Sequence, residues 1–93
     1  MTMSHAVVLI EAERDALSSL GSALAGIEGV AEAYSVTGEW DFVAIVRVPD
    51  HEQLAEVVTG QITTLAGVAR TQTLVAFQAY SQHDLEALFS IGE

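Results

Sequence analysis

The tripeptide Gly29-Val30-Ala31 recurs at an offset of 38 residues as Gly67-Val68-Ala69. At the same offset, the apolar stretch Val7–Ile10 corresponds to Ile45–Val48. A stripe of residues at helical spacing lies between the strand-like stretches of each copy: Leu17, Leu20, Leu24 and Ile27 in the first, and Ala55, Val58, Ile62 and Leu65 in the second. Two strand–helix–strand copies predict an α+β, ferredoxin-like βαββαβ fold with an antiparallel four-stranded sheet.

Turn residues and apolar periodicity set the boundaries of the expected elements. We expect strands at 6–11, 30–37, 40–48 and 68–79, and helices at 13–26 and 50–65. Asp50 is the expected N-cap of the second helix, with Gln53 in the capping-box position. A second capping-box pattern, Ser81–Asp84, predicts a short C-terminal helix. The whole chain, 1–93, is expected to be one domain.

Two of the expected strands are apolar on both faces, which predicts a dimer. In the 40–48 strand, Phe42, Ala44, Val46 and Val48 share one face, and Asp41, Val43, Ile45 and Arg47 share the other. We assign the Phe42 face to the helices, because the opposite face ends in two charged residues. The face formed by Val7, Leu9, Val43 and Ile45 then needs a cover. A second copy packed sheet to sheet supplies one.

Composition restricts the partners. The chain has thirteen Asp and Glu residues, three arginines and no lysine, so its formal net charge is −10. Nucleic acid and anionic membrane surfaces need a basic footprint that is absent here. Hydrophobic residues make up 51% of the chain, which is high for a small monomer and favours self-association. The chain has no cysteine, no apolar run of membrane-spanning length and no signal-peptide pattern, which suits the cytoplasm.

No sequence pattern supports a metal site, a cofactor or a catalytic nucleophile. His5, His51 and His83 lie far apart, without ligand spacing. No nucleophile elbow, phosphate loop or dinucleotide fingerprint occurs. Glu39 and Asp41 flank Trp40, but neighbours along a strand point to opposite faces and cannot form a carboxylate pair. We therefore expect no cofactor and no enzyme activity.

The remaining candidate site combines Gly38 and Asp41 in the central hairpin with Thr71 and Thr73 in the last strand. The backbone of Gly38 can approach a ligand closely, Asp41 can pair with an ammonium group, and the alternating threonines offer two hydroxyls on one face. These features suit an α-amino acid. Each also has a structural explanation, since Gly in a turn, Asp at a strand start and Thr in a strand are ordinary.

The stretches Val36–Phe42 and Gly67–Thr73, preceded by Gly29-Val30, resemble the ligand-binding (RAM) module of the Lrp/AsnC transcription regulators. The resemblance extends to about Phe77, and residues 80–86 look like the end of stand-alone RAM proteins. It implies sheet-to-sheet dimers, often four in a ring, with amino acids bound between dimers near Gly38, Asp41, Thr71 and Thr73. Full regulators carry a helix-turn-helix before the module, whereas this sequence starts at the first strand, so DNA binding is not implied.

Three functions are compatible with these observations. The first is an amino-acid-sensing and oligomerisation module that acts in transcription through full-length regulators rather than by binding DNA itself. The second is a small cofactor-independent enzyme of the dimeric α+β-barrel type, such as a monooxygenase, because fold alone does not define function. The third is a structural partner that mixes with full-length regulators. The hairpin motif and the lack of a catalytic cluster favour the first.

Overall fold

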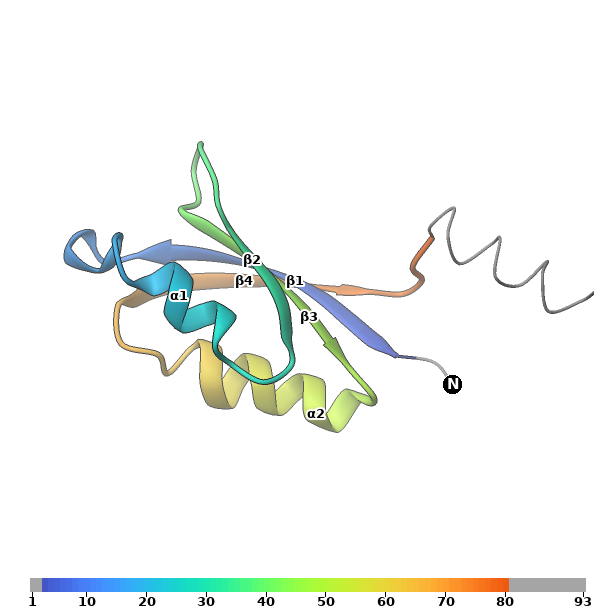
Figure 1. Cartoon of the computed structure of the whole chain (residues 1–93). Helices are drawn as coiled ribbons and strands as arrows, with labels where there is room; N and C mark the ends of the chain where they lie inside the picture. Colours follow the sequence, from blue (N-terminus) through green and yellow to red (C-terminus); the bar gives the residue numbers. More distant parts are fainter. Residues whose placement is uncertain (1–2, 81–93) are drawn as a thin grey trace, which may run out of the picture.

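A computed structural model describes residues 3–80, in which helical segments cover one face of a four-stranded sheet (Figure 1). The elements in chain order are β1 (Ser4–Ala12), the 3-10 turn η1 (Arg14–Ala16), α1 (Leu20–Ala25), β2 (Val30–Ser35), β3 (Phe42–Val48), α2 (His51–Ala55), its π-helical continuation η2 (Glu56–Ile62) and β4 (Val68–Ala76). The C-terminal helix expected from Ser81 lies outside the described residues.

The sheet has the strand order β2-β3-β1-β4, and every neighbouring pair is antiparallel. The two halves that repeat in the sequence are β1-α1-β2 and β3-α2-β4, so their first strands lie side by side at the centre. The predicted ferredoxin-like fold is therefore confirmed.

The assignment of the two sheet faces is also confirmed. Alternate residues of β1 and β3 are fully buried beneath the helices, while Val7, Leu9, Val43 and Ile45 on the opposite face are half-buried. The buried core consists of Ala6, Val8, Ile10, Leu20, Leu24, Phe42, Ala44, Val46, Val48, Leu54, Val57, Val58 and Ile62. No polar side chain among the described residues is buried with them. One layer of apolar side chains between sheet and helices holds the fold together.

The first helix is much shorter than the predicted 13–26. Residues 14–16 form a 3-10 turn, and the α-helix spans only Leu20–Ala25. Serines at 18 and 19 and a glycine at 21 are weak helix formers, which explains the interruption. Leu17, placed on the apolar stripe by its spacing, is 48% exposed. A Cβ on Gly21 would lie 3.2 Å from the Phe42 ring, so the glycine lets the helix approach β3.

The second helix begins at the predicted cap, where Asp50 Oδ1 accepts the Gln53 amide hydrogen at 2.8 Å. It widens into a π-helix over Glu56–Ile62 rather than continuing as an α-helix to residue 65. Threonine hydroxyls donate to carbonyls four residues earlier, as Thr59 does to Ala55 at 2.6 Å. Such bonds compete with regular helical geometry. Leu54, Val57, Val58 and Ile62 are buried against the sheet. Val58 and Ile62 belong to the predicted apolar stripe, whereas Ala55, which the spacing also placed on it, is exposed.

The repeated glycines have the same backbone role in both halves. Gly29 and Gly67 lie just before β2 and β4, with φ of 103° and 97°. A Cβ at Gly29 would lie 2.8 Å from Val57 Cγ2, and one at Gly67 would lie 2.5 Å from Ala16 Cβ. Both the positive φ and the lack of space require glycine, which explains why the repeat is clearest here.

Candidate functional site

The connection between β2 and β3 is longer than expected, because the predicted strands 30–37 and 40–48 leave only residues 38 and 39 between them. The strands end at Ser35 and resume at Phe42, and the amide of Val36 donates to the Asp41 carbonyl at 3.0 Å. Gly38 has φ of 110°, and a Cβ there would have no neighbour within 4 Å. This connection rises from the sheet on the side opposite the helices (Figure 1). It therefore lies over the face that we expect to be covered by a second copy.

Asp41 anchors the base of this connection to β1. Its amide donates to the Ile10 carbonyl at 2.9 Å, and its Oδ2 accepts the Ala12 amide at 2.8 Å. The Asp41 carboxylate therefore has a structural role at the start of β3. It does not pair with Arg47, whose Nη2 lies 3.8 Å from Glu32 Oε1 instead. No hydrogen bond within residues 3–80 uses Asp41 Oδ1, so that oxygen is available to a further donor.

The two threonines lie on the helix side of β4. Thr71 is opposite Ile10 and Thr73 is opposite Val8, and both of these β1 residues are buried beneath the helices. Directly opposite residues in an antiparallel pair share a face. Strand β1 separates both threonines from Asp41. A single chain therefore does not gather Gly38, Asp41, Thr71 and Thr73 into one pocket, and the four-residue site stays a prediction.

Two grooves of similar volume lie elsewhere in the described part of the chain. One, of about 290 Å³, lies between α2 and β4 and is lined by Leu54, Val58, Thr73 and Val75, among others. The other, of about 300 Å³, lies beside Pro49 and includes Glu28, Gln53 and Glu56. Neither of these grooves is lined by Gly38, Asp41 or Thr71, so the grooves do not coincide with the predicted site.

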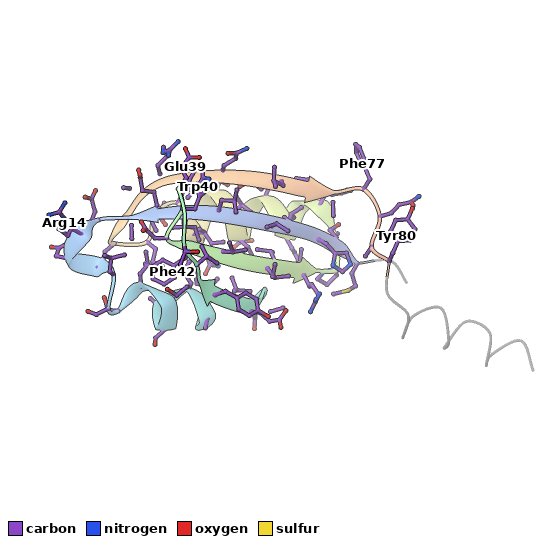
Figure 2. All side chains as sticks on the ribbon, turned by 90° about the horizontal axis from the view of Figure 1, so that it is seen from above. Arg14, Glu39, Trp40, Phe42, Phe77 and Tyr80 are labelled. Atoms are coloured by element: carbon purple, nitrogen blue, oxygen red, sulfur yellow. The ribbon has the colours of Figure 1, made fainter. Side chains whose placement is uncertain are left out.

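A cluster of charged and aromatic side chains joins the β2–β3 connection to β4. The guanidinium carbon of Arg70 lies 4.4 Å from the ring centroid of Trp40. Arg70 Nε is 3.4 Å from Glu11 Oε1, and its Nη2 is 3.7 Å from Glu39 Oε2. Glu39 and Trp40 lie beside β4 and away from Phe42 (Figure 2). We call these four residues, Glu11, Glu39, Trp40 and Arg70, the Arg70 cluster.

The sequence interpretation missed the Arg70 cluster. Glu11 belongs to β1, directly opposite Arg70 in the sheet register. An alignment of β1 against β4 by their apolar residues would have revealed that pair. The contact with Trp40 depends on how the 36–41 connection folds over the sheet, for which the sequence carries no pattern.

Tyr34, on the sheet face that the helices do not cover, has a raised pKa. Tyr34 donates from its hydroxyl to Glu32 Oε2 at 2.7 Å. The hydrogen bond to this carboxylate, with smaller contributions from desolvation and the negative charge of Glu32, raises the pKa of Tyr34 above its ordinary value.

Among residues 3–80 there is no group of three or more His, Cys, Asp or Glu that could hold a metal ion. In the same range, no helix is long and apolar enough to cross a membrane.

A four-stranded antiparallel sheet with one helix-covered face and one partly exposed apolar face defines a ferredoxin-like α+β module. The family profile described as "Lrp/AsnC ligand binding domain" matches residues 5–85. The chain belongs to this family, and the recognised resemblance is confirmed.

Several known proteins share this domain. An uncharacterized HTH-type transcriptional regulator of Pyrococcus horikoshii is 37% identical over 54 residues, which are 58% of this chain and 36% of that regulator. A corresponding regulator of Pyrococcus furiosus matches to the same extent. The chain thus matches little more than a third of the length of these curated relatives, which are transcriptional regulators.

Solved structures give the same fold. The protein TTHA0845 from Thermus thermophilus superposes with a TM-score of 0.78 at 49% identity, covering 85% of this chain and 99% of that one. AsnC of Escherichia coli superposes with a TM-score of 0.76 at 22% identity, covering 85% of this chain and 54% of that one. The complex of the regulator NMB0573 of Neisseria meningitidis with L-Met gives 0.74 at 16% identity, with 85% and 53% coverage.

Proposed function

We propose that this chain is an amino-acid-sensing and oligomerisation module that acts in transcription regulation through partner regulators. The observation that carries the proposal is the match of residues 5–85 to a ligand-binding domain whose relatives are transcriptional regulators. A structure of one regulator with this fold contains L-Met, which supports an amino acid as the ligand. The regulator context also favours sensing over the enzyme alternative.

Oligomerisation is part of the same proposal. The apolar face formed by Val7, Leu9, Val43 and Ile45 is only half-buried in one chain. Leu74, opposite Val7 on β4, continues this face and is 48% exposed. Burial of such a surface stabilises by roughly 25 cal/mol per Å². A homodimer that packs these faces together removes the surface from water, and a tetramer of dimers would extend the assembly.

The proposed ligand site lies at the junction of the 36–41 connection and β4. Asp41 Oδ1 holds the ligand ammonium, while the Gly38 backbone and the hydroxyls of Thr71 and Thr73 contact its polar groups. Because β1 separates Asp41 from the two threonines within one chain, the site is completed by residues of a neighbouring copy. This requirement ties ligand binding to assembly.

Thermal unfolding in the presence of each of the twenty protein amino acids tests the proposal. A ligand present at 100 times its Kd stabilises the folded state by about 2.7 kcal/mol, which shifts the Tm of a domain of this size by roughly 10–20 °C. We expect a small subset of amino acids to raise the Tm and to change the oligomer size. An unchanged Tm with all twenty contradicts the sensing function.

A further inference from the structure

The Arg70 cluster contains the opposite charges that an α-amino acid zwitterion requires. A free α-amino acid carries its carboxylate and its ammonium group on the same carbon atom, so its site needs a cation and an anion within a few ångströms of each other. Arg70 supplies the guanidinium, and Glu39, 3.7 Å away, supplies a carboxylate. Both are partly exposed to solvent, at 51% and 73% of their side-chain surface. A small molecule can therefore reach both.

Arg70 is positioned for a carboxylate but is only weakly paired in the chain alone. Its distances to Glu11 and Glu39, 3.4 and 3.7 Å, exceed the 2.7–2.9 Å that is typical of strong charge-assisted hydrogen bonds. Each pair is a single contact rather than a bidentate one. The cation–π contact holds the guanidinium over the Trp40 ring, and the N–H donors at its edge can still bind an acceptor. A ligand carboxylate can thus displace Glu39 and form two parallel bonds.

We propose that Arg70, oriented by Trp40, binds the carboxylate of the amino-acid ligand, and that Glu39 turns to its ammonium group. This inference rests on the proposed sensing function and adds two ligand-contacting residues, Arg70 and Glu39, to its site. The cluster carries two carboxylates and one guanidinium, in a chain of net charge −10. A further negative charge is unfavourable there, so the ligands are amino acids with neutral or basic side chains, and aspartate and glutamate are excluded.

The cluster is compatible with the proposed dimer. Glu11 and Arg70 lie opposite each other two residues beyond Leu9 and Gln72, at the end of the apolar face. Two residues of strand correspond to about 6.7 Å. A second copy seated on the apolar centre therefore leaves the Arg70 cluster at the rim, where a ligand can enter and where the neighbouring copy can contribute to the site.

Calorimetric titration of the full chain with each of the twenty amino acids tests the inference. For every amino acid that binds, Arg70→Gln should weaken binding at least tenfold and Arg70→Lys by less. The matched control is Arg47→Gln, which removes an equally exposed arginine paired with Glu32 at the opposite end of the sheet. It should bind within twofold of the unmutated chain. Trp40 is the single tryptophan, so its fluorescence should change on binding.

A comparison of ligands makes the test independent of any variant. The carboxamide of each binding amino acid should bind the unmutated chain at least tenfold more weakly than the free acid. In Arg70→Gln that difference should vanish, because the two changes remove the same contact. Equal affinity of Arg70→Gln and the unmutated chain, or tight binding of aspartate, overturns the inference while the sensing function stands. Binding of none of the twenty overturns both.

Discussion

The amide of Ala12 donates to the Asp41 carboxylate at 2.8 Å and joins the end of β1 to the start of β3. The bond gives Asp41 a structural role besides its proposed contact with a ligand ammonium group. Oδ2 serves the first role and Oδ1 the second, so substitutions can separate them.

Asp41→Ala should lower both stability and ligand affinity. Loss of a hydrogen bond to a charged group costs about 1.5–3 kcal/mol of unfolding free energy. Loss of the ammonium contact should weaken amino-acid binding at least tenfold. Asp41→Asn keeps an oxygen acceptor for Ala12 but removes the charge, so it should unfold nearly as the unmutated chain does and still bind weakly. Calorimetry and denaturant unfolding measure the two effects. Unchanged affinity in Asp41→Asn would restrict Asp41 to its structural role.

Three glycines in different surroundings give a graded stability series. Gly29→Ala combines a positive φ with a Cβ 2.8 Å from Val57 Cγ2, so we expect a loss of about 2–4 kcal/mol from strain and overpacking. Gly38→Ala has the positive φ but open space around the Cβ, so it should cost only about 1 kcal/mol. Gly60→Ala meets neither problem and should stabilise the helical segment by about 0.5–1 kcal/mol.

Urea unfolding of the three variants at fixed protein concentration measures this order. Equal losses for Gly29→Ala and Gly38→Ala would contradict the importance of the close contact with Val57.

The sequence predicted the fold well because its signals are local and repeated. The 38-residue repeat and the Asp50 cap each determine nearby backbone, and the structure confirms the repeated strands and the cap. The alternation along β3, with one wholly apolar face and one face that ends in charged residues, also identified the helix-covered side of the sheet. These features depend on neighbours in sequence or on strand alternation, both of which can be read from one chain.

The helices and the site were predicted less well for physical reasons. The apolar spacing of Leu17 fits a helix, but weak helix formers and the close contact of Gly21 with Phe42 restrict α1 to six residues. The π-helical η2 contains threonine hydroxyl bonds to the backbone, which compete with regular helical geometry and which a periodic apolar pattern does not report. The Trp40–Arg70 contact joins residues that are far apart in sequence through an irregular connection, and no motif encodes it.

The hydrogen bond from Tyr34 to Glu32 predicts a titration effect. The pKa of Tyr34 is raised, so the folded state holds this proton more tightly than the unfolded chain does. The associated stability is present below the ordinary pKa of tyrosine and is lost as the pH rises through the folded-state value. Glu32→Gln removes the carboxylate and should lower the pKa of Tyr34 towards its ordinary value.

Phenolate absorbance during a pH titration measures this pKa. A Tyr80→Phe background leaves Tyr34 as the single tyrosine. Glu28→Gln, which removes an exposed carboxylate elsewhere, is the control and should leave the titration unchanged. An identical Tyr34 titration in Glu32→Gln would show that the hydrogen bond does not govern the pKa.

The net charge predicts that these 93 residues alone do not bind DNA. At −10, with three arginines and no lysine, approach to a phosphate backbone is repulsive and releases no counterions. We expect no shift in a gel mobility assay at physiological salt, with or without amino acids. A saturable, sequence-specific shift by the purified chain would contradict this prediction and would require a basic surface that the composition does not provide.

The proposed dimer makes Ile45 a sensitive position. It lies opposite Val7 at the centre of the partly exposed apolar face. In a sheet-to-sheet dimer, Ile45→Arg would bury an unpaired charge, at a cost of about 3–5 kcal/mol, and should dissociate or unfold the protein. The matched control, Gln61→Arg, adds the same side chain to the exposed surface of η2 and should leave assembly intact. Light scattering and circular dichroism at micromolar concentration measure size and folding. A well-folded monomer from the unmutated chain would exclude the dimer, and an Ile45→Arg variant that still dimerises would place the interface elsewhere.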